Sequence, residues 1–383
     1  MKIFVHSASD NLTDWQSHGE GLICFSILNG LAERGHEIHA YAPHSAVKEK
    51  SQSLKIYNSK IKTSFGFTQF WQRGYEANQL FDQLSKTHRF DLVWRMNPLG
   101  NHCPVVPKHG QLPLVLGPFY YPWLDNQKLK SRFGFSLFEL AKPLALWGWK
   151  NVIDEADFVF AATKPHALEI KKTYSKENVD ELPLIINIPS QVKKYSLSPN
   201  QEICLSFVGN LVPNKRPDVF IKIIKAIREK AIPARAKLIG NGVMMPELRE
   251  LAKKLKIDQW IEFMGQVQNA EVPKLLQSTD IFISTAMGEP YGRNIVEAMS
   301  GGLVVICHKS GGAADFIRHN VDGMLVTDSD ENAFAQCVEL ILKNESLPQT
   351  LGTNAATKSK NWTKENVLSA LEKTLTNLIG QVK

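Results

Sequence analysis

Two glutamates, Glu289 and Glu297, stand with seven residues between them in the stretch from Ile281 to Val305. Residues 292–294 are expected to begin a short helix, where backbone N–H groups have no partner inside the helix and the helix dipole favours an anion such as phosphate. A carboxylate does not bind phosphate, so both glutamates need hydroxyl partners. We expect sugar hydroxyls on Glu289 and ribose hydroxyls on Glu297. The chemistry predicted is recognition of a nucleotide sugar.

The elements around this pair are predicted to be strand, loop, helix and strand. The apolar residues 281–284 form a strand, residues 288–290 (Gly-Glu-Pro) interrupt it, and residues 294–299 (NIVEAM) have helical composition. Two glycines at 301–302 end the helix, and residues 303–307 (LVVIC) resume a buried strand. A lone glutamate in such a segment is usually only solvated, so the argument depends on the pair and its glycines.

The Glu-x7-Glu spacing followed by Ala298 and Met299 resembles the donor-site signature of retaining family-4 glycosyltransferases of the GT-B fold. The resemblance extends over residues 201–345, whereas the first half of the chain resembles the family only in plan. It implies an α/β fold in which two Rossmann-like domains face each other across a cleft, with a C-terminal helix that crosses back to the first domain.

The same resemblance implies roles for individual residues, most of them in the second domain. Lys215 aligns with the lysine that neutralises the donor diphosphate, and Asn210 stands where the family usually has arginine directly after the glycine, so Arg216 is the candidate to restore that charge. The residues expected to act in catalysis are Lys215, Arg216 and Glu289. Those expected to bind the donor are Gly19, Gly21, Gly209, Asn210, Asn241, Gly242, Val267, Tyr291, Gly292, Arg293, Asn294, Ile295 and Glu297.

Length and composition bound the remaining possibilities. A chain of 383 residues predicts two domains, expected at residues 1–190 with the crossing helix 358–383, and at residues 200–357. The N-terminal apolar run is too short for a signal peptide, and no apolar run approaches the roughly 20 residues of a membrane span, so a cytoplasmic location is expected. The net charge of +7 fits an anionic substrate or membrane surface, because no nucleic-acid motif accompanies it.

The first domain is predicted to open with strand, glycine loop and helix. Gly19 and Gly21 are expected in the loop just before the helix, and Cys24 stands where a dinucleotide fingerprint needs a third glycine, so NAD binding is rejected. Residues 181–191 (ELPLIINIPSQ) are expected to form the last strand. The polar residues that follow two intermediate strands are candidates on the acceptor side: Arg95, Asn97, His102, Tyr120, Tyr121 and Trp123. The histidine that many family members carry there is missing, and His102 and Tyr120 are its possible substitutes.

Two further segments have alternative readings. Residues 128–150 combine lysines with phenylalanines and tryptophans, which is typical either of a helix that contacts an anionic membrane or of a domain helix with an aromatic core side. Asp328-Ser329-Asp330 resembles a metal-binding DxD motif, but its place before a helix favours a helix cap at Asp330, so no metal is expected. Five scattered cysteines without CxxC spacing predict neither a disulfide framework nor a zinc site.

The predicted function is transfer of a sugar, with retention of configuration, from a nucleotide diphosphate sugar to an acceptor hydroxyl of a glycan, a lipid-linked or a small molecule. No cofactor is expected. Asn269 lies near the base-binding segment with no nearby acid except Glu271 to pair with a guanine edge, which favours a UDP-sugar slightly over a GDP-sugar. The alternatives are a nucleotide-sugar epimerase or hydrolase of the same fold and an inactive nucleotide-sugar-binding protein. Product analysis with and without acceptor distinguishes the enzymes, and titration followed by a turnover assay identifies the inactive protein.

Overall fold

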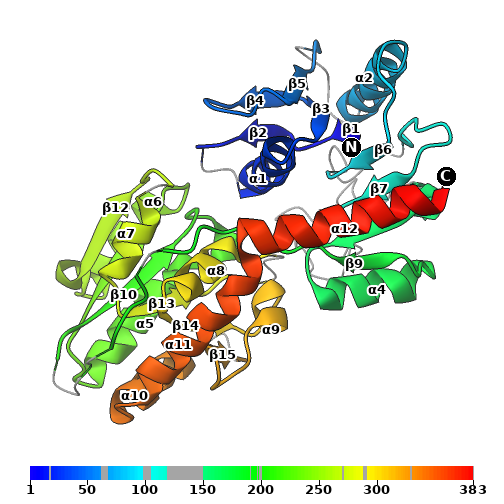
Figure 1. The fold of residues 1–383 in the computed structure, drawn as a ribbon. Coiled ribbons are helices and arrows are strands. Elements are labelled where there is room, and N and C mark those ends of the chain that lie inside the picture. Colours follow the sequence, from blue (N-terminus) through cyan, green and yellow to red (C-terminus); the bar gives the residue numbers. More distant parts are fainter. Residues whose placement is uncertain are drawn as a thin grey trace. The chain divides into compact units, whose positions relative to one another are not determined.

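A computed structural model describes residues 1–16, 19–61, 68–97, 105–118, 150–189, 191–195, 197, 201–269, 271–287, 291–327 and 330–382. The chain divides into two compact units, which we call unit 1 (Met1–Ile185 with Lys364–Lys383) and unit 2 (Ile186–Thr363). The elements of both units are labelled in Figure 1. None of the described helices has the length and the apolar character needed to cross a membrane.

Unit 1 is built on a parallel sheet of seven strands in the order β5-β3-β1-β6-β7-β8-β9. A small parallel pair, β2 and β4, lies outside this sheet. The described elements are β1 (Lys2–Ser7), β2 (Asn11–Thr13), α1 (Gly19–Glu33), β3 (Glu37–Ala42), β4 (His44–Ala46), β5 (Leu54–Asn58), α2 (Thr68–Leu84), β6 (Leu92–Arg95), β7 (Leu114–Leu116), β8 (Phe158–Ala161), α4 (Lys164–Tyr174), β9 (Val179–Glu181) and α12 (Lys364–Val382).

Unit 2 contains a parallel sheet of six strands in the order β12-β11-β10-β13-β14-β15. Its described elements are β10 (Ile203–Val208), the 3-10 turn η1 (Pro213–Lys215), α5 (Pro217–Glu229), β11 (Ala234–Ile239), α6 (Met245–Lys254), η2 (Asp258–Trp260), β12 (Ile261–Gly265), α7 (Val272–Gln277), β13 (Ile281–Ser284), α8 (Arg293–Ser300), β14 (Val304–His308), α9 (Gly312–Phe316), β15 (Met324–Val326), α10 (Glu331–Lys343), α11 (Leu347–Ser359) and η3 (Lys360–Trp362).

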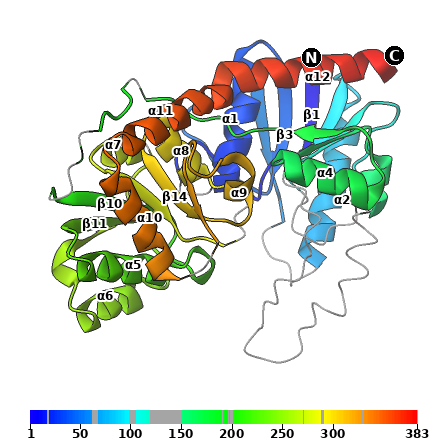
Figure 2. The same ribbon diagram turned by 90° about the horizontal axis from the view of Figure 1, so that it is seen from below.

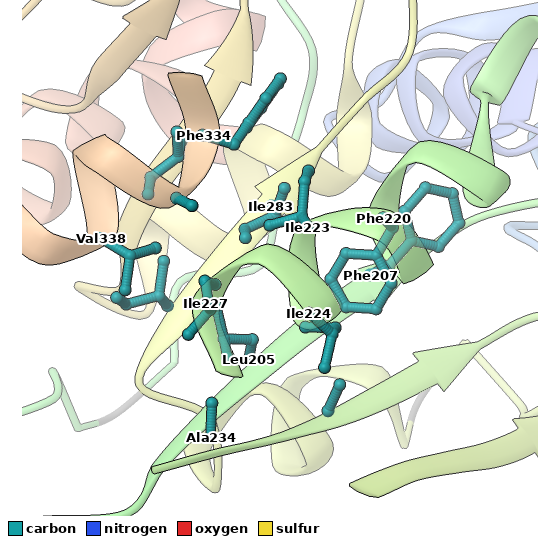
Figure 3. Packing of buried hydrophobic residues seen from close by; sticks show 14 of the residues in the cluster. Leu205, Phe207, Phe220, Ile223, Ile224, Ile227, Ala234, Ile283, Phe334 and Val338 are labelled. Carbon is teal, nitrogen blue, oxygen red and sulfur yellow. The ribbon is translucent and has the colours of Figure 1, made fainter. Parts of the chain in front are cut away.

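Helices cover both faces of the unit 2 sheet, with α5, α6 and α10 on one face and α7, α8 and α11 on the other (Figure 2). The strands between them alternate: Ile281 and Ile283 of β13 pack toward α5, whereas Phe282 packs toward α8. Buried residues of α5 recur at helical spacing, at Phe220, Ile223, Ile224 and Ile227, and meet β10 and α10 (Figure 3). The apolar periods of strand and helix therefore explain the layered core.

The C-terminal helix α12 belongs to unit 1 and packs on α1, as the family resemblance implied. A Cβ atom added at Gly30 would lie 2.6 Å from Leu368 Cδ1, so the two helices approach closely where α1 has no side chain. Arg34 then pairs with Glu365 (2.6 Å) and Glu372 (2.5 Å) beside this contact. Unit 1 is thus completed by the last segment of the chain.

Two sequence predictions about unit 1 are wrong. The strand expected at residues 181–191 is not found in the described part of this run (181–189 and 191), because β9 ends at Glu181 and Ile186 makes an isolated bridge to Thr363. The Leu182 amide still donates to the Ala161 carbonyl of β8 at 2.8 Å, but Pro183 has no N–H to continue the ladder. Leu184, Ile185 and Ile186 are buried beyond the end of β9. The glycines expected in a loop lie within a helix instead: α1 begins at Gly19, so Gly19 and Gly21 form its first turn.

Candidate functional site

The candidate site lies at the carboxyl ends of β10 and β13, which are neighbours in the unit 2 sheet. The strand order reverses direction between these two strands, because β10 connects to β11 on one side and β13 connects to β14 on the other. Loops leave the sheet in opposite directions at such a point, and ligands of open parallel sheets bind there. The predicted donor residues of unit 2 that the structure describes follow β10, β11 and β12, or lie in α8 and just before it.

Glycines let the loops after β10 and β11 touch through their backbones. A Cβ atom added at Gly240, where φ is +135°, would lie 1.9 Å from the carbonyl oxygen of Gly209, and one at Gly242 would lie 2.4 Å from the carbonyl oxygen of Leu211. The amide of Leu211 donates to the carbonyl of Asn241 at 2.9 Å in the same contact. Gly209 and Gly242, which are both predicted to bind the donor, therefore also have a role in packing these two loops together.

The loop that carries Lys215 and Arg216 is fastened to the segment that follows β13. The Thr285 hydroxyl donates to the carbonyl oxygens of both residues, at 2.9 and 2.8 Å, and the Met287 amide donates to the Asn214 carbonyl at 3.2 Å. The Arg216 Nη1 atom lies 3.1 Å from the sulfur of Met287. Lys215 and Arg216 are thereby held beside the segment that leads into residues 288–290. Thr285 and Lys215, which make this contact, are 70 positions apart in the sequence.

The N-terminus of α8 reaches the end of β10. Gly292 is the N-cap residue with φ +57°, a left-handed conformation that costs glycine little, and α8 runs from Arg293 to Ser300. The Asn294 side-chain amide donates to the carbonyl of Val208 at 2.5 Å, and Ile295 is buried below it. Tyr291 precedes the helix and is buried as well. The helix N-terminus is thus held beside Gly209 and Asn210, as the phosphate-binding hypothesis requires.

An ion pair occupies the first two turns of α8. Arg293 Nε donates to Glu297 Oε1 at 2.8 Å, and both side chains are about one-quarter exposed. The Arg293 Nη1 atom is buried and has no hydrogen-bond partner among the described residues. A buried guanidinium N–H without an acceptor is costly, so this atom marks a place where an anionic or hydroxylic ligand would be stabilised.

The predicted base-binding segment follows β12. Val267 packs against the core beneath α8, and the Gln268 amide donates to Glu271 Oε2 at 3.2 Å. Glu271 is also the N-cap residue of α7, but its side chain makes no capping hydrogen bond there. The Gln268 amide is therefore the local backbone group that holds its carboxylate.

Several predicted residues lie outside the part of the chain that the structure describes. They are Glu289, the acceptor candidates His102, Tyr120, Tyr121 and Trp123, residues 128–149 of the basic aromatic segment, and Asp328 and Ser329. Asp330 is described, and its side chain accepts a hydrogen bond from the Asn332 amide at 3.1 Å as the N-cap of α10. The cap predicted from the sequence is confirmed.

The corresponding edge of the unit 1 sheet contains buried titratable groups. Burial, followed by the neighbouring Asp10 carboxylate, raises the pKa of Glu20 from 4.5 to about 8, and Glu20 Oε1 has no hydrogen-bond partner among the described residues. Burial and then Arg95 lower the pKa of His6 from 6.5 to about 3. Arg95 itself is fully buried and donates to the Val105 carbonyl at 2.7 Å, so its side chain belongs to the interior rather than to a solvent-facing acceptor surface.

Sequence comparison identifies the domain that carries the unit 2 site. Residues 190–358 match the family model of glycosyl transferases group 1. This chain carries a glycosyl transferases group 1 domain. Of similar proteins, N-acetyl-alpha-D-glucosaminyl L-malate synthase from Bacillus anthracis is 24% identical over 358 residues, which are 88% of each chain. D-inositol 3-phosphate glycosyltransferase from Salinispora arenicola is 25% identical over 295 residues, 65% of this chain and 66% of that protein.

Comparison with solved structures identifies the fold of the whole chain. HepE from Anabaena, solved in complex with UDP, is 18% identical and matches 98% of this chain and all of its own with a TM-score of 0.72. Sucrose-phosphate synthase from Thermosynechococcus elongatus is 15% identical and matches 99% of each chain with a TM-score of 0.75. At these identities the likeness shows the fold alone, and that fold is GT-B, with a Rossmann-like sheet in each unit.

Proposed function

We propose that this protein is a retaining glycosyltransferase that moves a sugar from a nucleotide diphosphate sugar to an acceptor hydroxyl. The observation that carries the proposal is the convergence of three features at the carboxyl ends of β10 and β13. These are the Lys215–Arg216 loop held by Thr285, the N-terminus of α8 held against Val208, and the buried Arg293 Nη1 atom. Together they form a positively charged, rigid place for a diphosphate.

In the proposed reaction the bond between the anomeric carbon and the leaving phosphate oxygen breaks while the acceptor oxygen bonds to the same face of that carbon. The acceptor hydroxyl proton passes to the departing phosphate oxygen, so charge and atoms balance without a protein nucleophile. Lys215, Arg216 and the amides at the start of α8 would stabilise the negative charge that develops on the diphosphate. Loss of one such group typically costs about 3–4 kcal/mol in the barrier.

A uridine nucleotide is the donor that we favour. HepE is solved with UDP, and Glu271, the acid that could otherwise pair with a guanine edge, is already engaged by the Gln268 amide. Acceptors of the proposed reaction are hydroxyl groups of a glycan, a lipid-linked or a small molecule. Peripheral contact with an anionic membrane through residues 128–150 belongs to the same proposal.

Titration of the purified protein with UDP, GDP and their hexose conjugates tests the donor site. We expect UDP to bind, and Lys215→Met to weaken UDP binding about 10- to 100-fold, since a hydrogen bond to a charged group contributes about 1.5–3 kcal/mol. Lys225→Met is the matched control, because Lys225 lies in α5 and pairs with Glu229. Failure of all these nucleotides to bind would refute the donor site.

Product analysis tests the reaction itself. A transferred sugar with the anomeric configuration of the donor supports a retaining transferase. Epimerised or free sugar formed without acceptor would establish the alternative enzymes, and binding without turnover over a broad acceptor set would establish the inactive binding protein. We further propose that turnover is independent of divalent metals, so EDTA should leave the initial rate unchanged.

A further inference from the structure

A cluster of potential metal ligands lies in unit 1, on elements that the proposed reaction does not use. Glu37 and His39 are two residues apart in β3 and therefore point to the same face of the sheet, and His88 lies in the turn after α2. Each offers one ligand atom, and the three atoms lie within 4.8 Å of one another. The cluster is at the amino ends of the strands, because Glu37 begins β3 and pairs with Lys2 at the start of β1.

The spacing of the ligand atoms is close to that of a tetrahedral site. Glu37 Oε1 lies 2.8 Å from His39 Nε2 and 3.9 Å from His88 Nε2. Bonds of about 2.0–2.2 Å from zinc to nitrogen and oxygen place tetrahedral ligand atoms about 3.4 Å apart. The two observed distances lie on either side of this value, and no two of the three ligand atoms are more than 4.8 Å apart, so a metal would need modest side-chain movements.

In both histidines, a hydrogen-bond partner of Nδ1 orients the ring. His88 Nδ1 lies 3.2 Å from the Leu84 carbonyl oxygen and 2.8 Å from the Thr87 hydroxyl, so an Nδ1–H donor leaves the Nε2 lone pair directed at the cluster. His39 Nδ1 lies 3.0 Å from the Tyr57 hydroxyl, which can accept a hydrogen bond from Nδ1–H when Nε2 binds a metal. A carbonyl or hydroxyl on the second nitrogen is the usual support of a metal-binding histidine.

Two lysines compete with a metal for the carboxylate. Lys2 Nζ lies 2.9 Å from Glu37 Oε2, which leaves Oε1 to act as a single ligand atom. Lys55 Nζ lies 3.4 Å from Oε1 itself, and its side chain is 47% exposed, so it can move into solvent when a metal binds. The competition predicts that removal of Lys55 strengthens metal binding, an effect opposite in sign to the removal of a ligand.

We propose that Glu37, His39 and His88 bind a transition-metal ion, with zinc preferred. Imidazole nitrogens with one carboxylate oxygen select zinc and its neighbours over magnesium and calcium. Three protein ligands leave a fourth position for water. The ion would join β3 to the turn between α2 and β6, so its expected effect is on the stability of unit 1 and not on sugar transfer.

The test is titration of the full-length, tag-free protein with zinc chloride after removal of bound metals by chelation. We expect one zinc ion per chain and a higher melting temperature of the zinc-loaded protein. His88→Gln should weaken binding by at least about 10-fold, the effect that loss of even an indirect partner of a metal ligand has. Lys55→Ala should strengthen binding, and magnesium should not bind.

His44→Gln is the matched control, since His44 is an exposed histidine of the same unit. It should leave zinc affinity and stoichiometry unchanged. His88 is half-buried at the surface, so its replacement avoids the risk that changing the fully buried His39 prevents folding. Absence of stoichiometric zinc binding, or equal binding by the parent and His88→Gln, would overturn the proposal.

Discussion

Glu297 has a structural partner in addition to its proposed ligand. It holds Arg293 by an ion pair across one turn of α8, and the same guanidinium has a buried Nη1 atom without a described partner. A nucleotide would therefore meet a carboxylate and a guanidinium that already orient each other. Removal of the charge of Glu297 should affect both the ribose contact and the position of Arg293.

We predict that Glu297→Gln weakens binding of free UDP about 10-fold or more, because a charge-assisted hydrogen bond contributes about 1.5–3 kcal/mol. Glu289→Gln should leave free UDP binding unchanged and lower kcat for the sugar donor, since its proposed partner is the sugar and its contact strengthens in the transition state. Titration and initial rates measure both effects. Asp330→Asn is the control, and parental behaviour of both glutamate variants would show that the site assignment is wrong.

Glu20 predicts a pH dependence of unit 1 stability. Its pKa is raised from 4.5 to about 8 in the folded chain, so the folded state prefers the neutral acid. This contribution to the free energy of unfolding is fully present below pH 4.5 and is lost as the pH rises from 4.5 to 8. Glu20→Gln should therefore stabilise unit 1 more at pH 8 than at pH 5, in urea denaturation.

The control for this prediction is Glu49→Gln, which changes an exposed carboxylate of the same unit. It should shift the unfolding free energy equally at both pH values. An equal shift for Glu20→Gln would contradict the buried state of its carboxyl group.

At the scale of elements, apolar contact rather than charge should hold α12 on α1. Leu368 is fully buried against Gly30, so Leu368→Ala should lower the free energy of unfolding by about 2–5 kcal/mol. Arg34→Met breaks ion pairs to Glu365 and Glu372 near the surface and should cost only about 0.2–1 kcal/mol. Urea denaturation of both variants measures the difference, and a larger loss for Arg34→Met would reverse the assignment.

Elements with a strong apolar period were predictable from the sequence, and elements that depend on distant partners were not. The helix after Arg216 and the strand at 281–284 follow from spacing alone. The apolar run at 181–191 has a strand-like composition, but its burial comes from other segments and Pro183 interrupts its ladder. The sequence predicted a loop at Gly19 and Gly21, where the structure has the first turn of α1, because glycine favours loops unless packing fixes it in a helix.

The same division applies to the site. The places of the Glu297 motif and of Lys215 in the candidate site could be predicted from the sequence, since both lie in local patterns next to predicted elements. The hydrogen bonds of Thr285 to the Lys215–Arg216 loop join positions about 70 residues apart, and no local pattern indicates them. The cluster of Glu37, His39 and His88 was likewise invisible, because His88 approaches β3 only through the order of the sheet strands.

At the scale of the whole molecule, unit 2 is one continuous segment of the chain between the two parts of unit 1, and its first and last residues contact each other. The amide of Ile186 donates to the carbonyl of Trp362 at 3.0 Å, and Ile186 bridges Thr363. With its own core, residues 186–363 should fold as a separate protein. We predict that this fragment binds UDP within a factor of about 10 of the full chain, or 1.4 kcal/mol. A greater loss in titration would mean that Gly19, Gly21 or other unit 1 residues contribute to donor binding.

Because α12 packs on α1, unit 1 can complete its fold only after the C-terminal helix has been synthesised. Lys364, the first residue of α12, contacts Glu33 at the end of α1 across 331 positions of the chain. At a ribosomal rate of about 5–20 residues per second, the start of α12 is synthesised roughly 15 to 70 s after the end of α1. Unit 2 is complete before that moment, because all of its residues precede Lys364. The nascent chain is therefore expected to finish its second half first and its first half last.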